Sequence, residues 1–188
     1  QPDNLKPGTV YPISDIDLAT RLSFFLWSSI PDDELLSIAE RNEIRKPGVL
    51  EQQVNRMLAD AKSETFIKNF GEQWLALRKI DLAAPQKAVF PLFDGALRDA
   101  MKQELSTWFA YMVKSDKSVL DILDADYTFV NERLAQHYGI EGVYGEKFRK
   151  VKINQPERAG LLGKPGLLMV TSFNSRTSPV VRGKWVLE

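Results

Sequence analysis

The amino-acid sequence predicts an all-α protein, an irregular multi-helix bundle with at most one short strand pair. Apolar residues recur at three- and four-residue steps along most of the chain, which places them on one face of each of several helices. Many of these stripes begin at a residue that can cap a helix or at a proline, both of which are typical of helix starts. The composition, 44% hydrophobic and 27% charged over 188 residues, is that of a folded globular domain.

Four helices are predicted in the first half, after an extended lead-in at residues 1–13 that is rich in proline. Ser14 is placed to cap the first helix. Pro31 begins the second with three acidic residues in its first turn, where the helix dipole favours them. After a third helix, Ser63 is expected to cap a fourth, whose apolar stripe is Phe66, Ile67, Phe70, Trp74 and Leu77. An aromatic stripe is far more often core than a cofactor site, so we expect Trp74 to be buried.

The second half begins with the longest predicted helix. Asp94 is placed to cap it, and its stripe contains Leu97, Met101, Leu105, Trp108 and Met112. Trp108 is therefore expected in the core. Glu104 lies beside the stripe, and we expect it to be partly buried in an ion pair, with an arginine of the first helix as the candidate partner.

Two shorter elements come after the longest helix. Asn131 is placed to cap a short helix that Gly139 ends as a left-handed residue. Residues 148–153 alternate between polar and apolar side chains, which predicts a short strand.

The last stretch, residues 158–188, is the least ordinary part of the sequence. An apolar run leads into a loop of small polar residues, Thr171–Ser178, and Pro179 then opens a final helix that Ser178 can cap. Short polar side chains can fold back on such a loop and leave basic side chains free to meet a partner. The candidate interface residues are Asn174, Arg176, Thr177, Ser178, Arg182 and Trp185. The competing interpretation is a capped loop with solvated charges.

Composition excludes several classes of site. The sequence has no cysteine, so it contains no disulfide, no thiolate metal site and no covalent haem attachment. The only histidine, His137, has no second histidine or cysteine to complete a zinc site, and we assign no metal, cofactor or catalytic residue. A metal or general-base role for His137 stays open as an alternative. No apolar run is long enough to cross a membrane.

The charges balance overall but are unevenly distributed. The 25 basic and 25 acidic residues cancel, so we expect no nucleic-acid partner. From Glu146 onward, however, nine basic residues stand against three acidic ones. This end of the chain suits an anionic ligand or an acidic neighbour, unless it serves only to offset the acidic half.

Five stretches, in order, resemble one protein family. They are residues 18–36 (LATRLSFFLWSSIPDDELL), 52–60, 70–77, 124–140 and 177–188 (TSPVVRGKWVLE). The chain resembles the helical domains of unknown function in large planctomycete-type cytochrome-containing proteins, and the resemblance covers nearly everything from Ser14 onward. The sequence departs from the family at residues 163–165, so we do not expect a regular helix there.

The resemblance implies a place within a larger exported protein, periplasmic or at the cell surface. Residues 14–145 are expected to form a helical domain, and residues 146–188 the start of a second, truncated module. The implied function is that of a non-catalytic scaffold or interaction domain in an electron-transfer protein, docking against a module that carries haem c. The chain itself is expected to bind no cofactor, and its partners are neighbouring domains of the same polypeptide. By the same resemblance, the parent protein would be an oxidoreductase.

Two other classes of function stay open. A polysaccharide- or protein-binding module would use exposed aromatic side chains, so the exposure of the four tryptophans is informative: Trp27, Trp74, Trp108 and Trp185. A hydrolase would need a serine (Ser172, Ser175 or Ser178) beside His137 and an aspartate. The sequence has no G-x-S-x-G motif, and serines in such a loop usually form turns and caps.

Overall fold

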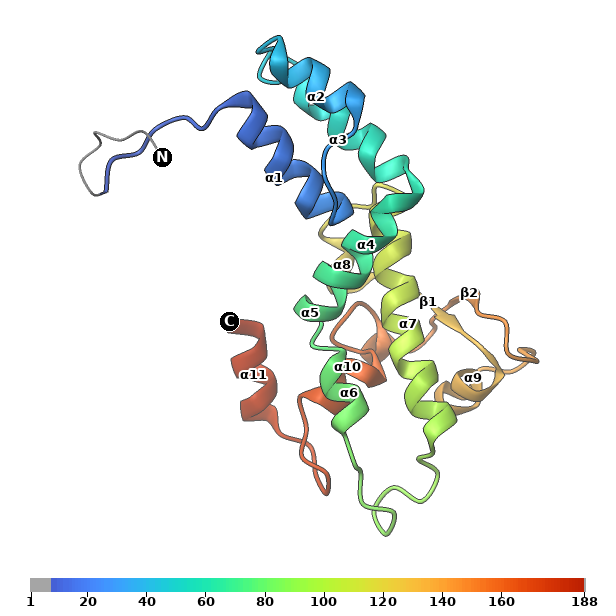
Figure 1. The fold of residues 1–188 in the computed structure, drawn as a ribbon. Coiled ribbons are helices and arrows are strands. Elements are labelled where there is room, and N and C mark those ends of the chain that lie inside the picture. Colours follow the sequence, from blue (N-terminus) through green and yellow to red (C-terminus); the bar gives the residue numbers. More distant parts are fainter. Residues whose placement is uncertain (1–7, 188) are drawn as a thin grey trace. The chain divides into compact units, whose positions relative to one another are not determined.

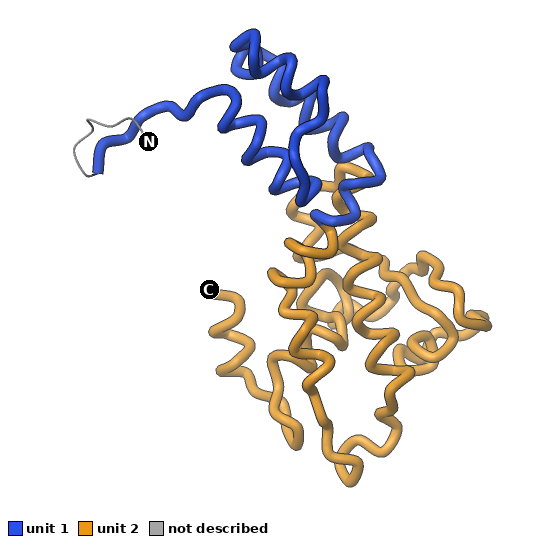
Figure 2. Tube along the Cα trace, viewed as in Figure 1, with its two compact units in different colours: residues 1–66 blue, residues 67–188 orange. Residues whose placement is uncertain are grey.

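The structure, a computed structural model, describes residues 8–187. As predicted, these residues are mostly helical, with one two-stranded antiparallel sheet (Figure 1). The chain forms two compact units, residues 1–66 (unit 1) and 67–188 (unit 2) (Figure 2). Residues 8–13 of the predicted lead-in contain no helix or strand, and residues 1–7 of it lie outside the described part.

Unit 1 is built from helices. They are α1 (Asp15–Trp27), α2 (Asp33–Glu40), α3 (Val49–Ala59), a short 3-10 turn (Ala61–Ser63) and α4 (Glu64–Phe66). Ser14 caps α1, as predicted, by accepting a hydrogen bond from the amide of Asp17 at 3.0 Å. Asp32 caps α2, and its carboxylate binds Arg56 of α3 at 2.6 Å, which ties the two helices together.

The core of unit 1 contains Ala19, Leu26, Trp27, Leu35, Ala39, Ile44 and Met57. Trp27 is buried within it, and its Nε1 donates to the carbonyl of Met57 at 2.9 Å. The indole therefore has its hydrogen bond inside the core, which makes its burial favourable.

The fourth predicted helix is interrupted. The chain forms α4, a π-helical turn (Ile67–Gly71) and α5 (Glu72–Trp74) in place of one regular helix. Ser63 is not the cap that the sequence suggested. Asp60 caps the preceding 3-10 turn, accepting from the amide of Lys62 at 2.7 Å, while the Ser63 hydroxyl is buried with no hydrogen-bond partner among the described residues.

The prediction that Trp74 is a core residue is wrong, because its side chain is 40% exposed. A π-turn adds a residue to the helical repeat and rotates the residues after it around the helix axis. Gly71 takes the inward position instead: a Cβ added there would lie 2.7 Å from the ring of Phe109. Trp74 packs beside that ring, with 5.9 Å between the ring centres, and keeps one side in solvent.

Unit 2 is organised around α7 (Gly95–Lys114) (Figure 1). Asp94 caps α7, as predicted, by accepting from the amide of Leu97 at 2.7 Å. The elements packed against α7 include the π-helical turn, α6 (Arg78–Leu82), β1 (Tyr127–Val130), α9 (Glu132–Tyr138) and α10 (Pro165–Val170). The other elements of the unit are α5, α8 (Asp121–Asp124), β2 (Arg149–Lys152), a 3-10 turn (Pro156–Arg158) and α11 (Pro179–Leu187).

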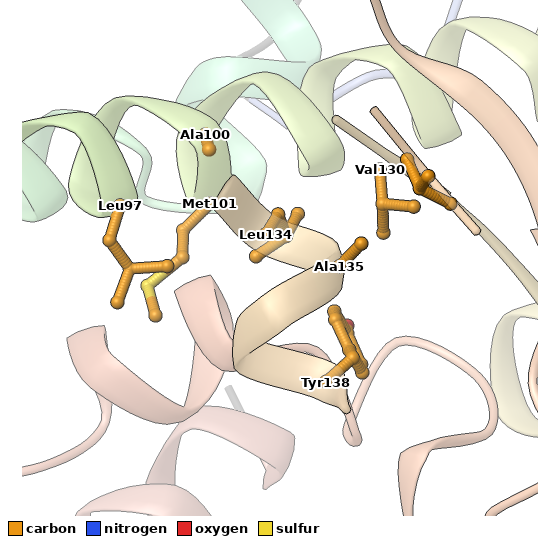
Figure 3. Close-up of a cluster of buried hydrophobic side chains, with 8 residues drawn as sticks. Leu97, Ala100, Met101, Val130, Leu134, Ala135 and Tyr138 are labelled. Carbon is orange, nitrogen blue, oxygen red and sulfur yellow. The ribbon is translucent and has the colours of Figure 1, made fainter. Parts of the chain in front are cut away.

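The hydrophobic core of unit 2 lies between α7, β1 and α9 (Figure 3). It contains Leu97, Ala100, Met101, Val130, Leu134, Ala135, Tyr138 and Val143. Trp108, farther along α7, is fully buried, as its place in the apolar stripe predicted. Asn131 caps α9 and Gly139 ends it with a φ of 69°, also as predicted.

The predicted strand is β2, and its partner is a strand that the sequence did not reveal. β2 pairs with β1 in antiparallel register, with Tyr127 opposite Lys152 and Val130 opposite Arg149. Farther along, no regular helix was expected at residues 163–165; residues 163–164 are not helical, but Pro165 begins α10.

The compact units do not follow the boundary expected between residues 145 and 146. β2 and α10 lie beyond it and pack in the same unit as β1 and α7. The division into modules at 14–145 and 146–188 stays a prediction from the resemblance. In the part of the chain that the structure describes, no helix is both long and apolar enough to cross a membrane.

Candidate functional site

A cavity of about 670 Å³ lies in unit 2, between α7, α9, α10 and the loops that follow α6 and α10. Most of its wall is apolar and includes Val89, Phe90, Leu97, Met101, Leu168 and Phe173. Ligand sites in proteins have this size and are lined mainly by apolar side chains, with a few polar groups. The cavity is therefore the candidate functional site of this unit.

One wall is the irregular segment 83–94, which hydrogen bonds fix at both ends. The amide of Gln86 donates to the carbonyl of Asn174 at 2.9 Å, which joins the loops that follow α6 and α10. At the other end, Arg133 of α9 donates to the carbonyl of Leu92 at 2.6 Å and pairs with Asp94 at 3.0 Å. These bonds hold the apolar side chains of the segment over the cavity.

The opposite wall is the polar loop 171–178. The hydroxyl of Thr171 donates to the carbonyl of Leu167 at 2.8 Å, and that of Ser172 to the carbonyl of Leu168 at 2.6 Å, so both fold back onto the end of α10. The amide of Phe173 donates to the carbonyl of Arg176 at 2.9 Å and closes a tight turn.

The structure separates the six candidate interface residues into three groups. Asn174, Arg176 and Thr177 line the cavity. Ser178 is buried and caps α11, accepting a hydrogen bond from the amide of Val181 at 3.3 Å. Arg182 and Trp185 lie on α11, outside the cavity lining.

Helix α11 contains no buried residue. Three of its apolar side chains are exposed, Val180 by 82%, Leu187 by 88% and Val186 by about half. The Nε atom of Arg182 is itself buried but has no hydrogen-bond acceptor among the described residues. The surface of α11 therefore contains exposed apolar side chains together with a partly exposed arginine.

The cavity lining carries positive charge and no negative charge. Its basic residues are Lys79, His137, Arg158 and Arg176, and it contains neither Asp nor Glu. Partial burial and the positive charges of Arg158 and Arg133 lower the pKa of His137, so its imidazole is neutral at pH 7. Among these residues the sequence indicated Arg176 as an interface candidate and His137 as an alternative; the excess of basic residues after Glu146 was the only signal for Arg158.

This arrangement gives the hydrolase alternative no support. The Ser178 hydroxyl is occupied as a cap and does not line the cavity, and that of Ser172 is bonded to the backbone. Within the described residues, no hydrogen bond joins His137 to a serine, and no carboxylate stands in the lining to orient the imidazole. A serine nucleophile needs both contacts.

A buried polar cluster lies inside unit 2; the sequence predicted an ion pair for Glu104 but not its partner or the hydroxyls around it. The Glu104 carboxylate accepts hydrogen bonds from the hydroxyls of Thr128 and Tyr138, the latter at 2.6 Å. Lys164 donates to the Thr128 hydroxyl at 3.0 Å, and its Nζ lies 3.9 Å from the carboxylate. The ion-pair partner of Glu104 is thus Lys164, not an arginine of the first helix. Both charged side chains are fully buried.

Burial governs the protonation of this cluster. It raises the pKa of Glu104, against the opposing effects of Lys164, Thr128 and Tyr138. It lowers the pKa of Lys164 to about 8, although Glu104 acts in the other direction. The second oxygen of Glu104 and the Nε1 of Trp108 have no hydrogen-bond partner among the described residues. The cluster does not line the cavity, so its role is to hold α7, β1, α9 and the start of α10 together.

The chain offers little to a metal or to haem. The described residues contain no group of three or more His, Cys, Asp or Glu side chains that could hold a metal ion. The full sequence has no cysteine for thioether bonds and one histidine, so haem c does not fit these residues. A haem implied by the resemblance would belong to another module.

Comparison with known families places these features in context. Residues 13–140, more than half of the chain, match the family described as PSD4, a protein of unknown function (DUF1592). The match spans most of unit 1 and continues through α9 of unit 2. Comparisons with curated proteins and with solved structures found no match.

Proposed function

The chain belongs to the DUF1592 family of proteins of unknown function, and we propose that it is a non-catalytic interaction domain that docks against a haem c-bearing module of the same exported polypeptide. Helix α11 is the proposed docking element. The observation that carries the proposal is the absence of any buried residue in this nine-residue helix.

Physical arguments support a partner for α11. Helices this short are marginal in water unless tertiary packing stabilises them. The exposed side chains of Val180, Val186 and Leu187 would lose unfavourable contact with water in an interface. The Nε atom of Arg182 has no acceptor among the described residues, and arginine binds carboxylates in a bidentate manner, haem propionates among them. Trp185, partly exposed on the same helix, is the type of residue that anchors interfaces.

Substitutions on α11 test the proposal. In the 188-residue chain, Val180→Asp, Leu187→Asp and Arg182→Ala should change the free energy of unfolding by no more than about 0.5 kcal/mol, because these side chains lie on a surface helix. In the intact polypeptide, the same changes should shift the haem midpoint potential and expose the region of α11 to trypsin. Val119→Asp is the matched control, since Val119 is 72% exposed in unit 2 but lies outside α11. Potentials and cleavage patterns that stay as in the wild type for all three variants would contradict the proposal.

One observation favours a second candidate, a polysaccharide- or protein-binding module. Phe70 and Trp74 are about 40% exposed and stack on each other, with their ring centres 6.2 Å apart and their planes at 20°. Trp27 and Trp108 are buried and cannot take part. Affinity electrophoresis with a panel of soluble polysaccharides tests this candidate: retardation that Trp74→Ala abolishes would support it, and the absence of retardation would remove its support.

A further inference from the structure

The cavity of unit 2 joins an apolar wall to basic side chains that have no acidic partners. Two bases on neighbouring elements, both outside the lining, are paired: Lys102 binds Asp81 at 2.6 Å, and Arg133 binds Asp94 at 3.0 Å. Within the described residues no salt bridge involves the charged bases of the lining, which are Lys79, Arg158 and Arg176. Unpaired charges collected around one hollow create a positive potential there, which attracts an anion.

Both arginines of the lining are held in place by aromatic rings. The guanidinium of Arg158 lies 5.5 Å from the ring centre of Tyr138, and that of Arg176 lies 4.8 Å from the ring centre of Phe173. A guanidinium stacked on a ring keeps its N–H edge available for a carboxylate. Arg158 has one long hydrogen bond, 3.5 Å to the carbonyl of Gly163, so most of its donors remain available.

Several apolar side chains of the cavity wall are exposed to solvent. Leu82 and Leu92 are more than four-fifths exposed, and Val89 and Phe173 about half, although all four side chains line the cavity. An apolar patch of this kind on a soluble domain marks a binding surface. Because the volume of about 670 Å³ falls within the range of small-molecule sites, the occupant is a compact ligand.

We propose that this cavity binds a small amphipathic carboxylate, with its hydrocarbon body against Phe90, Met101 and Leu168 and its carboxylate between Arg158 and Arg176. The absence of any acidic side chain in the lining selects an anion over a neutral or cationic ligand. The site uses α7, α10 and the loops around them, and does not use α11. The proposed ligand site and the proposed docking function therefore rest on different elements, and either can fail without the other.

Titration with octanoate tests the proposal, with octanol as the neutral probe of the same chain length. Amide NMR spectra of the 188-residue chain should show saturable shifts at Asn174 and Thr177, which line the cavity. Octanol should bind about ten-fold more weakly or worse, because a charge-assisted hydrogen bond contributes roughly that factor. Arg158→Gln and Arg176→Gln should each weaken octanoate binding by about the same factor. Arg176 is exposed, so its removal leaves the fold intact.

The single histidine supplies a second readout. His137 lines the cavity, and burial, followed by the positive charges of Arg158 and Arg133, holds its pKa below the ordinary value. A bound carboxylate would add a negative charge beside it and raise that pKa. A histidine titration with and without octanoate should therefore show an upward shift, and octanol should cause none.

Lys147→Gln is the charge control, because it removes one positive charge from an exposed position outside the lining. It should change the octanoate affinity by less than about two-fold. The proposal is overturned if octanol binds as tightly as octanoate, or if Lys147→Gln weakens binding as much as Arg176→Gln. The absence of saturable shifts at the cavity amides, which is the result expected if the cavity receives only a protein segment, also overturns it.

Discussion

At the scale of single residues, the most consequential feature of unit 2 is the buried pair of Glu104 and Lys164. Taking two charges out of water costs several kcal/mol per ion, and their attraction offsets this only when the remaining hydrogen-bonding groups are satisfied. Here Thr128 and Tyr138 both donate to one oxygen of Glu104, and the other oxygen has no partner among the described residues. Burying the pair therefore contributes little net stability, whereas removing one partner leaves an uncompensated buried charge and strongly destabilises the fold.

A double-mutant cycle tests this account of the pair. Lys164→Met should lower the free energy of unfolding by about 3–5 kcal/mol, because it leaves the carboxylate of Glu104 buried without a countercharge. The combined variant, Lys164→Met with Glu104→Gln, should lose less than either single variant. Urea denaturation measures all four proteins. Losses that simply add would show that the two side chains are not coupled.

The stability of Lys164→Met should also depend on pH. Burial holds the pKa of Glu104 above its ordinary value of 4.5, so the folded state binds the proton more tightly than the unfolded state does. The free energy of unfolding then falls as the pH rises from about 4.5 through the raised pKa. Compared with the combined variant, Lys164→Met should lose little at about pH 4.5 and markedly more at about pH 7.5. A difference that does not change with pH would show that Glu104 is not the titrating group.

At the scale of elements, Gly160 fixes how the chain returns from β2 to α8. Its amide donates to the carbonyl of Ala125 at 2.9 Å, and the next amide, of Leu161, donates to the carbonyl of Ile122 at 2.8 Å. The backbone of Gly160 has a φ of 59°, and a Cβ added there would lie 2.2 Å from the carbonyl oxygen of Leu123. Only glycine allows this approach of two backbone segments.

Gly160→Ala should therefore destabilise the protein far more than Gly139→Ala. Gly139 has a similar φ of 69°, but an added Cβ would meet no atom within 4 Å, so the substitution costs only the left-handed conformation, about 1–2 kcal/mol. Gly160→Ala adds the displacement of the backbone of α8, roughly 1–3 kcal/mol more. Thermal denaturation compares the two variants. Equal melting temperatures would show that the segment moves aside without cost.

The helix ends that the sequence predicted correctly are those decided locally. Ser14, Asp94 and Asn131 each cap a helix by binding the amide three residues on, a contact that needs no distant partner. The π-turn at residues 67–71 depends on the packing of Gly71 against Phe109, which lies far along the chain. Spacing alone cannot reveal such a contact, so the aromatic stripe predicts a buried Trp74 where the structure has a partly exposed one.

At the scale of the whole molecule, the candidate site was only partly predictable. The sequence singled out Asn174, Arg176 and Thr177 because their loop contains more polar and basic side chains than a connection between two helices needs. Their partners in the cavity, Lys79 and Arg158, come from separate elements that only the fold brings together. The net charge of zero likewise gives no sign that the ionisable side chains lining the cavity are all basic.

The proposed docking of α11 is most directly tested by hydrogen–deuterium exchange. The amides of residues 181–187 should exchange rapidly in the 188-residue chain, because none of these residues is buried. In the intact polypeptide they should exchange at least about ten-fold more slowly, since docking against the haem-bearing module would stabilise the helix. The amides of α7 around Leu105 and Trp108, which are buried already, serve as the internal reference and should not change. Equal exchange of α11 in the two proteins would contradict the account.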